Sequence, residues 1–283
     1  MEKPDVRDLI RAEGFRFDKS LGQNFVFDGN LLGAIAADAG VCKDDTVVEI
    51  GTGAGTLTAA LAERAGRVVS FEVDERLRGI LSLSLQDRDN VEVVFRDVLR
   101  MKDCEIATLT GGPFRVVANL PYCVTSPMIM RFVESALPVT GITVMVQKEV
   151  ADRLCAAPAT PDYAAITLAV RIFGDARVTR TVSRKMFMPP PNVDSAVVRI
   201  DRAEDRLAGE NVPFVKKLVR AGFAMRRKTL VNNLCSALSL PREKAEAAVV
   251  AAGFSPMVRG ETLSLEDYVA LAHSVSGVTD GTI

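Results

Sequence analysis

The sequence has 283 residues, with 35 Lys and Arg against 36 Asp and Glu, one His, five Cys and no Trp. Its 48% hydrophobic and 25% charged residues are typical of a globular protein and exclude a disordered or fibrous chain. The length predicts one large domain or two modest ones, which need no disulfide or metal for stability. The net charge of −1, taken alone, argues against nucleic acid as a partner.

No signal peptide, membrane span or metal site is expected. The N-terminal stretch MEKPDVRDLIRAEGF carries scattered charges, and the longest apolar runs are far too short to cross a bilayer. The cysteines are odd in number and form no CxxC pair, a pattern typical of reduced thiols in a cytoplasmic protein. The single His273 gives little support to catalysis by a Ser–His or Cys–His pair.

The first two thirds of the chain alternate short β-rich runs with helical segments. This alternation predicts right-handed crossovers and a doubly wound, Rossmann-like α/β domain with a parallel sheet. The predicted strands are 46–50, 67–73, 91–95, 114–120, 142–147 and 195–200, and the predicted helices between them include 57–66, 74–85 and 128–137.

The last third of the chain differs in kind, because its apolar residues recur at helical spacing. Glycine or proline lies near several of the segment ends, as expected where helices begin or end. We therefore predict a small helical domain over 203–283, after a catalytic domain over 1–202. The expected helical segments are 212–225, 228–240, 241–254 and 264–275.

The glycines after the first predicted strand indicate a turn that approaches a ligand closely. The sequence GTGAGTLT places Gly51, Gly53 and Gly55 at alternate positions. Glycine permits a positive φ and close contact at the carboxyl end of a strand. The spacing lacks the G-x-G-x-x-G pattern that seats a pyrophosphate, so it favours S-adenosylmethionine, which has no phosphate, over a dinucleotide.

Two carboxylates follow the next predicted strands. Glu72 ends the second strand and can accept hydrogen bonds from both ribose hydroxyls of an adenosine ligand, and Asp97 can accept one from its adenine amino group. Because the carboxyl ends of parallel strands share one edge of a sheet, these residues and the glycines predict an adenosine site. Taken singly, the glycines could be only a tight turn and each carboxylate only a solvated loop residue.

The tetrad Asn119-Leu120-Pro121-Tyr122 closes the fourth predicted strand. Pro121 ends the strand, so the Asn119 amide oxygen and the Leu120 carbonyl can both accept hydrogen bonds from an exocyclic amine. Tyr122 offers a flat face to a base extruded from its stack. This arrangement aims an otherwise poor nucleophile at a sulfonium methyl by positioning and electrostatics. The alternative is an ordinary strand-ending turn with a buried tyrosine.

With these motifs, the chain resembles the ribosomal RNA adenine dimethyltransferases, most of all those that act on the small subunit. The resemblance extends from about Lys19 to Asp267, and the shared order of its motifs makes it specific. Cys123, Ala164 and Val231 depart from the pattern, and Val231 weakens the expected rRNA contacts slightly. The motifs are KSLGQNFVFD (19–28), VVEIGTGAGTLT (47–58), RDVL (96–99), VVANLPY (116–122), VQKEVADRL (146–154), MFMPPPNVDSAVVRI (186–200) and RRKTLVNNL (226–234).

The resemblance implies an S-adenosylmethionine-dependent methyltransferase that dimethylates two adjacent adenosines near the 3′ end of small-subunit rRNA, with a role in small-subunit biogenesis. It also implies that Phe187, in FMPPP, packs against the target adenine beside Tyr122, although a core or loop aromatic is the alternative. The implied cofactor contacts are Asn24, Val26, Gly51, Glu72, Asp97 and Asn119, and we include Gly53 and Gly55 as members of the same glycine loop.

The net charge conceals an uneven distribution. Residues 171–230 contain 14 Lys and Arg against 6 Asp and Glu, a local charge of +8, so the rest of the chain carries −9. A basic segment of this kind suits an RNA backbone, although it could also be only a solvated face. The expected RNA-binding residues are Arg184, Lys185, Arg226, Arg227 and Lys228.

These observations favour a monomeric, cytoplasmic rRNA methyltransferase whose partner is small-subunit rRNA within a small ribosomal subunit or its precursor. One alternative is a large-subunit adenine methyltransferase of the antibiotic-resistance type, which shares the glycine loop and the Asn-Leu-Pro-Tyr tetrad. Another is a non-catalytic ribosome-assembly factor that retains the fold.

Overall fold

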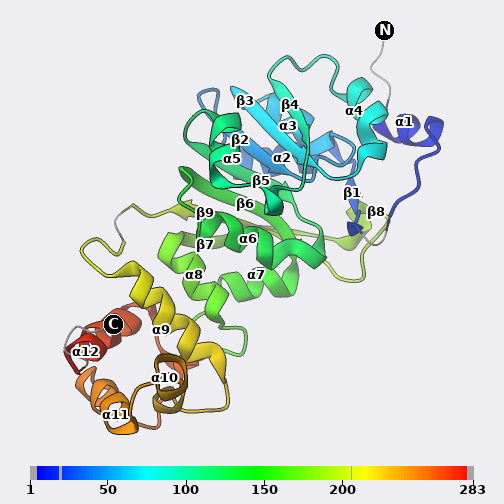
Figure 1. Ribbon diagram of the computed structural model, residues 1–283. Helices are drawn as coiled ribbons and strands as arrows, with labels where there is room; N and C mark the ends of the chain where they lie inside the picture. The colour runs from blue at the N-terminus through cyan, green and yellow to red at the C-terminus, as the bar shows by residue number, and fades with distance from the viewer. Residues whose placement is uncertain (1–4, 19–20, 205, 279–283) are drawn as a thin grey trace. The chain divides into compact units, whose positions relative to one another are not determined.

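Buried runs of Val and Ile form the centre of a mixed β-sheet (Figure 1). The computed structural model describes residues 5–18, 21–204 and 206–278, and in this part of the chain the sheet has seven strands. In spatial order they are β4 (Val91–Phe95), β3 (Arg67–Glu72), β2 (Thr46–Ile50), β5 (Phe114–Asn119), β6 (Val139–Gln147), β9 (Ser195–Arg202) and β7 (Gly174–Val182).

The direction of the strands confirms the predicted parallel sheet and adds an antiparallel part. β2 to β6 are parallel, whereas β9 runs antiparallel to β6. The six predicted strands are all present, and β7 was not predicted. β3 and β4 lie on one side of β2, and β5 and β6 lie on the other, so the chain reverses its winding between β2 and β5. Doubly wound sheets bind ligands at the carboxyl ends of the strands beside this reversal.

Helices cover both faces of this sheet, as expected for strands that are apolar on both sides. One face packs Val47, Val68 and Val117 against apolar residues of α2 and α3. On the other face Phe132 of α6 meets Phe114 of β5 edge to face, with 6.3 Å between the ring centroids. The helices of this part of the chain are α1 (Val6–Ala12), α2 (Gly29–Asp38), α3 (Thr56–Ala62), α4 (Arg78–Ser84), α5 (Asp103–Thr110), α6 (Thr125–Val133) and α7 (Lys148–Leu154).

The predicted helices are present, but their ends were wrong by several residues. The segment expected at 74–85 begins with a 3₁₀ turn, η2 (Glu75–Leu77), because the Asp74 carboxylate caps the Arg76 N–H. The helix expected at 128–137 begins earlier, at Thr125, and includes Pro127 in its first turn, where the missing N–H is tolerated. Helices α1, α2, α5, α7 and α8 (Ala165–Phe173) were not predicted.

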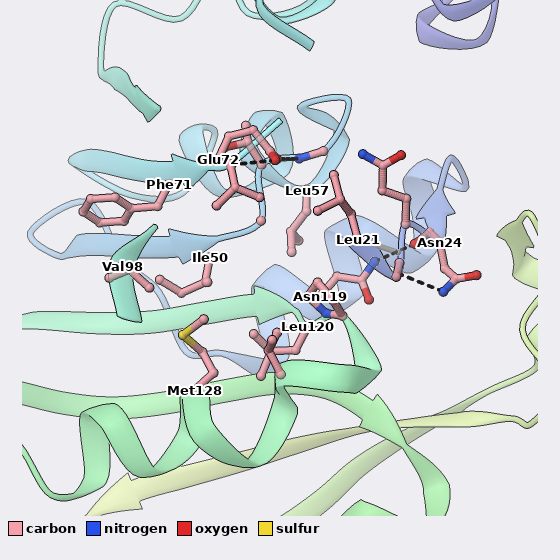
Figure 2. Close-up of a pocket in the computed structure, with 18 of the residues that line it drawn as sticks. Leu21, Asn24, Ile50, Leu57, Phe71, Glu72, Val98, Asn119, Leu120 and Met128 are labelled. Carbon is pink, nitrogen blue, oxygen red and sulfur yellow. Dashed lines mark hydrogen bonds between the residues drawn. The ribbon is translucent and has the colours of Figure 1, made fainter. Parts of the chain in front are cut away.

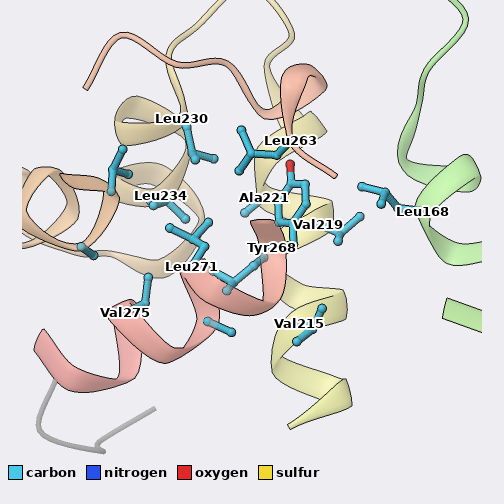
Figure 3. Close-up of a cluster of buried hydrophobic side chains, with 14 of the residues drawn as sticks. Leu168, Val215, Val219, Ala221, Leu230, Leu234, Leu263, Tyr268, Leu271 and Val275 are labelled. Atoms are coloured by element: carbon cyan, nitrogen blue, oxygen red, sulfur yellow. The ribbon is translucent and has the colours of Figure 1, made fainter. Parts of the chain in front are cut away.

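The helical region packs around its own apolar core (Figure 3). Tyr268 and Leu271 of α12 are fully buried there, together with Leu168 of α8. The Tyr268 hydroxyl donates a hydrogen bond of 3.0 Å to the Gly260 carbonyl, which satisfies this buried polar group. The helices are α8 (Ala165–Phe173), α9 (Val212–Ala224), α10 (Leu230–Leu238), α11 (Arg242–Ala251) and α12 (Leu265–Val278).

The contacts divide the chain into two compact units. One unit contains the chain up to residue 151 together with 176–202, and the other contains 152–175 together with the chain from 203 onward. The helical unit therefore includes a segment that the sequence analysis placed in the catalytic domain. The functional division into 1–202 and 203–283 stays a prediction, and its extreme residues 1–4 and 279–283 lie outside the described part of the chain.

Candidate active site

A cavity of about 470 Å³ lies where the parallel strands β2, β3 and β5 end. Figure 2 shows Ile50, Phe71 and Val98 gathered on one side of it, and Asn24 and Asn119 on the other. This volume lies within the usual range of small-molecule sites, roughly 300–1,000 Å³. An apolar wall with a few convergent polar groups can hold a nucleoside by its ring and its edges.

Glu72, the last residue of β3, ties that strand to the glycine loop. It is buried, and one carboxylate oxygen accepts the Gly53 N–H at 2.7 Å while the other accepts those of Val73 and Asp74 at 2.8 and 2.9 Å. Burial raises the pKa of Glu72, and the three N–H donors partly offset this. Gly53 has a φ of +54°, and a Cβ on this residue would lie only 3.2 Å from the Phe25 ring.

A second acid, Glu49 on β2, lies fully buried beside this loop and was not singled out from the sequence. Its carboxylate accepts hydrogen bonds from Thr58 Oγ1 at 2.6 Å and Ser70 Oγ at 2.5 Å. The Ser70 hydroxyl also lies 2.7 Å from the hydroxyl of Thr52, which lines the cavity. Burial raises the pKa of Glu49 to about 8, so the carboxyl group is mostly neutral at pH 7. A charged residue inside the buried run TVVEI was the available signal.

Asp97 follows β4 and caps the turn η3 (Val98–Arg100). Its carboxylate accepts the Leu99 N–H at 3.0 Å and lies 3.2 Å from the Arg100 guanidinium. Asp97 also lines the cavity, and its side chain is partly exposed. A carboxylate has about four acceptor positions, so Asp97 can still accept a hydrogen bond from an amino group of a ligand.

Asn119, the last residue of β5, has a fixed amide. Its Nδ2 donates a hydrogen bond of 3.0 Å to the Asn24 carbonyl, drawn in Figure 2. The planar amide therefore presents Oδ1 as an acceptor. Pro121, with φ of −57°, ends the strand, and the Leu120 side chain is buried below the turn.

Tyr122 begins the turn η4 (Tyr122–Val124) and lines the cavity. Its hydroxyl oxygen lies 2.8 Å from the Ser195 hydroxyl oxygen on β9. Burial raises the pKa of Tyr122, so its phenol is neutral at physiological pH. The ring is therefore held by its far end, while the aromatic body lies at the cavity.

One wall of the cavity comes from residues 21–26, which we call the strap. Asn24 Nδ2 donates to the Gly22 carbonyl at 3.1 Å, and Thr56 Oγ1 donates to the Val26 carbonyl at 2.8 Å. The strap includes β1 (Phe25–Val26), which pairs with β8 (Phe187–Met188). Lys19 and Ser20, at the start of the first recognised motif, lie outside the described residues.

A sequence profile of the family "Ribosomal RNA adenine dimethylase" matches residues 14–275. The chain belongs to this family. The profile spans the strap, the glycine loop and the strand ends around the cavity, so the family assignment and the site geometry concern the same residues.

Relatives within the dimethylase family match along nearly their whole length. "Ribosomal RNA small subunit methyltransferase A" of Geobacillus thermodenitrificans is 44% identical, over 95% of this chain and 94% of the relative. The protein of the same name from Clostridioides difficile is 40% identical, over 96% of this chain and 95% of the relative.

Two solved structures confirm the predicted fold class, a methyltransferase domain followed by a helical region. The 23S rRNA methyltransferase ErmE has a TM-score of 0.70 at 28% identity, covering 89% of this chain and 100% of that chain. A dimethyladenosine transferase from Plasmodium falciparum has a TM-score of 0.73 at 23% identity, covering 90% of this chain and 98% of that chain, and shows the fold alone.

The structure brings most of the predicted site residues of this dimethylase together. Gly55 is an exception, because it lies against α4, where a Cβ would be 2.9 Å from Ser84 Oγ. Gln23, which donates to Asp74, lines the cavity and was not predicted. The predicted residues that line the cavity are Asn24, Val26, Gly51, Gly53, Glu72, Asp97, Asn119, Leu120, Pro121 and Tyr122.

Phe187 does not line the cavity. Its side chain is buried in the apolar core with that of Val26. The two residues lie opposite each other where β1 pairs with β8. The structure thus places Phe187 as the core aromatic of the alternative interpretation. A contact with the target base stays a prediction.

The predicted RNA-binding residues are exposed, but they differ in their contacts. Arg184 bonds through its guanidinium to the Asn192 carbonyl, and Lys185 lies beside it in η5 (Arg184–Met186). In the helical unit, Arg226 bonds to Glu261 at 3.3 Å and to the Pro161 carbonyl at 3.1 Å. The two residues after it, Arg227 and Lys228, are exposed and have no ion-pair partner among the described residues.

The described residues offer neither a metal site nor a membrane span. No group of three or more His, Cys, Asp or Glu side chains is arranged to hold a metal ion. No described helix is long and apolar enough to cross a membrane. The sequence-based expectations of a cytoplasmic location and of a monomer stay predictions.

Proposed function

We propose that this protein transfers methyl groups from S-adenosylmethionine to the exocyclic amines of two adjacent adenosines near the 3′ end of small-subunit (16S-type) rRNA. Its substrate is that rRNA within a small ribosomal subunit or its precursor. One observation supports the proposed chemistry: the same cavity is lined by the buried carboxylate of Glu72, which would bind the ribose, and by the fixed amide of Asn119, which would accept a hydrogen bond from the target amine.

The donor set of the cavity fits S-adenosylmethionine. Glu72 would accept hydrogen bonds from the ribose, Asp97 would accept one from the adenine amino group, and the apolar wall at Ile50 and Val98 would pack against the adenine ring. When bound, S-adenosylmethionine would supply a methyl group on a sulfonium: the amine nitrogen would bond to the methyl carbon as the carbon–sulfur bond breaks to leave a thioether, and the amine proton would go to solvent. The protein itself needs to hold the amine nitrogen in line with the methyl group, because this positioning lowers the activation barrier of methyl transfer without an imidazole base.

Asn119 and its neighbours would position the target adenosine. Asn119 Oδ1 and the Leu120 carbonyl would accept the two N–H groups of the amine, and the Tyr122 ring would stack on the extruded base. Asn119 would also contact the methionyl end of the cofactor. The exposed Arg184, Lys185, Arg227 and Lys228 would contact phosphates of the RNA.

The choice of small-subunit rRNA rests on the relatives. Two that carry the name small subunit methyltransferase A are 44% and 40% identical over nearly the full chain. A second candidate substrate is large-subunit rRNA, because ErmE, a 23S rRNA methyltransferase, covers 89% of this chain at 28% identity.

The test is a partition experiment with small and large ribosomal subunits that lack adenine dimethylation. Purified protein is incubated with both subunits and S-adenosylmethionine labelled on its methyl group, and the RNAs are then separated and counted. We expect label in small-subunit RNA. Label only in large-subunit RNA would establish the second candidate, and no label in either RNA would favour a non-catalytic assembly factor.

A further inference from the structure

The strap contacts both halves of the cavity. Its Phe25 ring packs on Gly53 of the glycine loop, and Gly22 approaches Pro121 so closely that a Cβ on Gly22 would lie 3.1 Å from the proline ring. The Asn24 carbonyl, between these two contacts, accepts the Asn119 amide. The position of the strap therefore determines where the Asn119 amide points.

Gln23 anchors this strap through both ends of its side-chain amide. Nε2 donates a hydrogen bond of 2.7 Å to the Asp74 carboxylate, and Oε1 accepts the Asp18 N–H at 2.8 Å. Asp74 is 5% exposed and is held in turn by the Arg76 guanidinium through two bonds of 2.7 Å. A buried carboxylate held in this way is a rigid anchor, because a shift would leave charged groups unpaired.

Asp74 is also bonded to a residue on the other side of the cavity. Its N–H donates to Glu72 Oε1 at 2.9 Å, so the anchor of Gln23 lies next to the carboxylate that would bind the ribose. Hydrogen bonds thus link Glu72 to Asp74 and Asp74 to Gln23 of the strap. The next residue of the strap, Asn24, is bonded to Asn119. Such networks can hold two groups at a fixed separation.

We propose that Gln23 is a positioning residue, which fixes the Asn119 amide relative to the Glu72 end of the cavity. This inference rests on the proposed function, since it assigns Asn119 the role of holding the target amine. Without the Gln23–Asp74 bond, the strap keeps its contacts at Val26 and Pro121 but loses the anchor next to Asn24, so the Asn24 carbonyl and the Asn119 amide bonded to it are positioned less precisely. The Glu72 carboxylate keeps its own three N–H donors, so cofactor binding persists.

The expected kinetic effect follows from this separation. A displacement of about 1 Å at a reacting group costs on the order of 100-fold in rate, so Gln23→Glu should lower the single-turnover methyl-transfer rate roughly 10- to 100-fold. Gln23→Glu removes the donor and sets a second carboxylate against Asp74. The cofactor dissociation constant should rise by a smaller factor than the rate falls, because Glu72 and Asp97 keep their positions and only the contacts of the strap and of Asn119 are disturbed.

A paired variant tests the bond itself. In Gln23→Glu with Asp74→Asn, Nδ2 of the new Asn donates to the new Glu, and the second Glu oxygen still accepts the Asp18 N–H. The Asn Oδ1 still accepts from Arg76 Nε, and only the bond from Arg76 Nη2 to this side chain is lost. We expect this double variant to recover much of the lost rate. Arg78→Ala is the matched control, because Arg78 lies two residues beyond Arg76 but pairs with the exposed Glu75. Its rate should equal that of the wild type.

A second readout does not depend on methyl transfer. The side-chain amide resonance of Asn119, assigned as the one absent from Asn119→Ala, should shift or broaden in Gln23→Glu and return towards its position in the double variant. An unchanged resonance, a wild-type rate, or equal losses of rate and cofactor affinity would overturn the inference. If the wild type methylates no rRNA, the proposed function fails, and the resonance still decides the role of Gln23.

Discussion

The hydroxyl oxygen of Tyr122 lies 2.8 Å from that of Ser195, which is fully buried on β9. The two residues are 73 positions apart, so the bond fastens the turn after β5 to a strand two places away in the sheet. Because the hydroxyl is engaged, the phenol ring has little freedom to rotate out of the cavity wall. The ring, and not the hydroxyl, is then the part available to a base.

This arrangement separates two substitutions of the same residue. Tyr122→Phe keeps the ring and should lower the methyl-transfer rate by less than about tenfold. Tyr122→Ala should lower this rate by about 100-fold or more, because stacking is worth roughly 1–3 kcal/mol per base and the ring also positions the amine. Single-turnover assays on small ribosomal subunits measure both. Equal rates for the two variants would show that the ring has no role.

Ser195→Ala supplies the matching test of the hydroxyl bond. It should reproduce the effect of Tyr122→Phe, and the double variant should be no worse than either single one, because each change removes the same bond. Each single variant also leaves one hydroxyl without its partner, which costs about 1–3 kcal/mol of unfolding free energy. Additive losses of rate in the double variant would contradict this coupling.

Glu72 should combine a structural role with ligand binding. Glu72→Ala removes the acceptor of three backbone N–H groups, so it should weaken cofactor binding and also lower the melting temperature. Asp97→Asn removes a charge from a partly exposed side chain and should raise the cofactor dissociation constant with a smaller change in melting temperature. Calorimetric titration and thermal unfolding measure these effects. Unchanged cofactor affinity in Glu72→Ala would remove Glu72 from the ligand site.

Glu49 should make the stability of the protein depend on pH. Burial raises the pKa of Glu49 from 4.5 to about 8, so the folded protein binds a proton that the unfolded chain releases. The stability that Glu49 contributes is fully present below about pH 4.5 and is lost as the pH rises through about 8.

Glu49→Gln removes this titration while keeping a neutral side chain of the same size. The unfolding free energy of the variant should therefore fall less than that of the wild type between about pH 5 and pH 9, measured by urea denaturation across this range. Glu92→Gln, which changes an exposed glutamate paired with Arg67, is the control and should leave the slope unchanged. Parallel curves for Glu49→Gln and the wild type would show that Glu49 is ionised in the fold.

The basic residues of the helical unit should divide by function. Arg227→Ala and Lys228→Ala should each weaken RNA binding and reduce the slope of log affinity against log salt by about 1, as for a phosphate contact. Arg226→Ala should lower stability instead, because its guanidinium already bonds to Glu261 and the Pro161 carbonyl. Filter binding at several salt concentrations, with thermal unfolding, distinguishes the two. A full change of slope for Arg226→Ala would contradict this division.

Local sequence patterns were sufficient for the strands and for most of the cavity. The runs at Thr46–Ile50 and Phe114–Asn119 are mostly buried and rich in Val, which marks them as strands. Because strand ends in a parallel sheet meet at one edge, Glu72, Asp97 and Asn119 could be grouped in advance. What escaped prediction depends on contacts distant in sequence. The Gln23–Asp74 and Tyr122–Ser195 bonds join residues 51 and 73 positions apart, and β1 has only two residues.

The charge count was the least reliable guide. The charge of +8 over 171–230 already counts Asp201 and Asp175, which pair with Arg177, Arg199 and Arg206. Arg180 and Arg226 pair with carboxylates outside the segment, Asp38 and Glu261, so less than +8 is available to RNA. Strand β7 was also missed because its polar and charged residues hide its β pattern.

The most direct test of the central claim is to measure dimethyladenosine in small-subunit rRNA after incubation with wild-type protein and with Asn119→Ala. Nuclease digestion and mass spectrometry quantify the modified nucleoside, and calorimetry checks that the variant still binds S-adenosylmethionine. We expect dimethyladenosine at two adjacent positions near the 3′ end with the wild type, and a rate lower by about 100-fold or more with Asn119→Ala. Dimethyladenosine formed equally fast by both proteins would contradict the role of the cavity in aligning the amine.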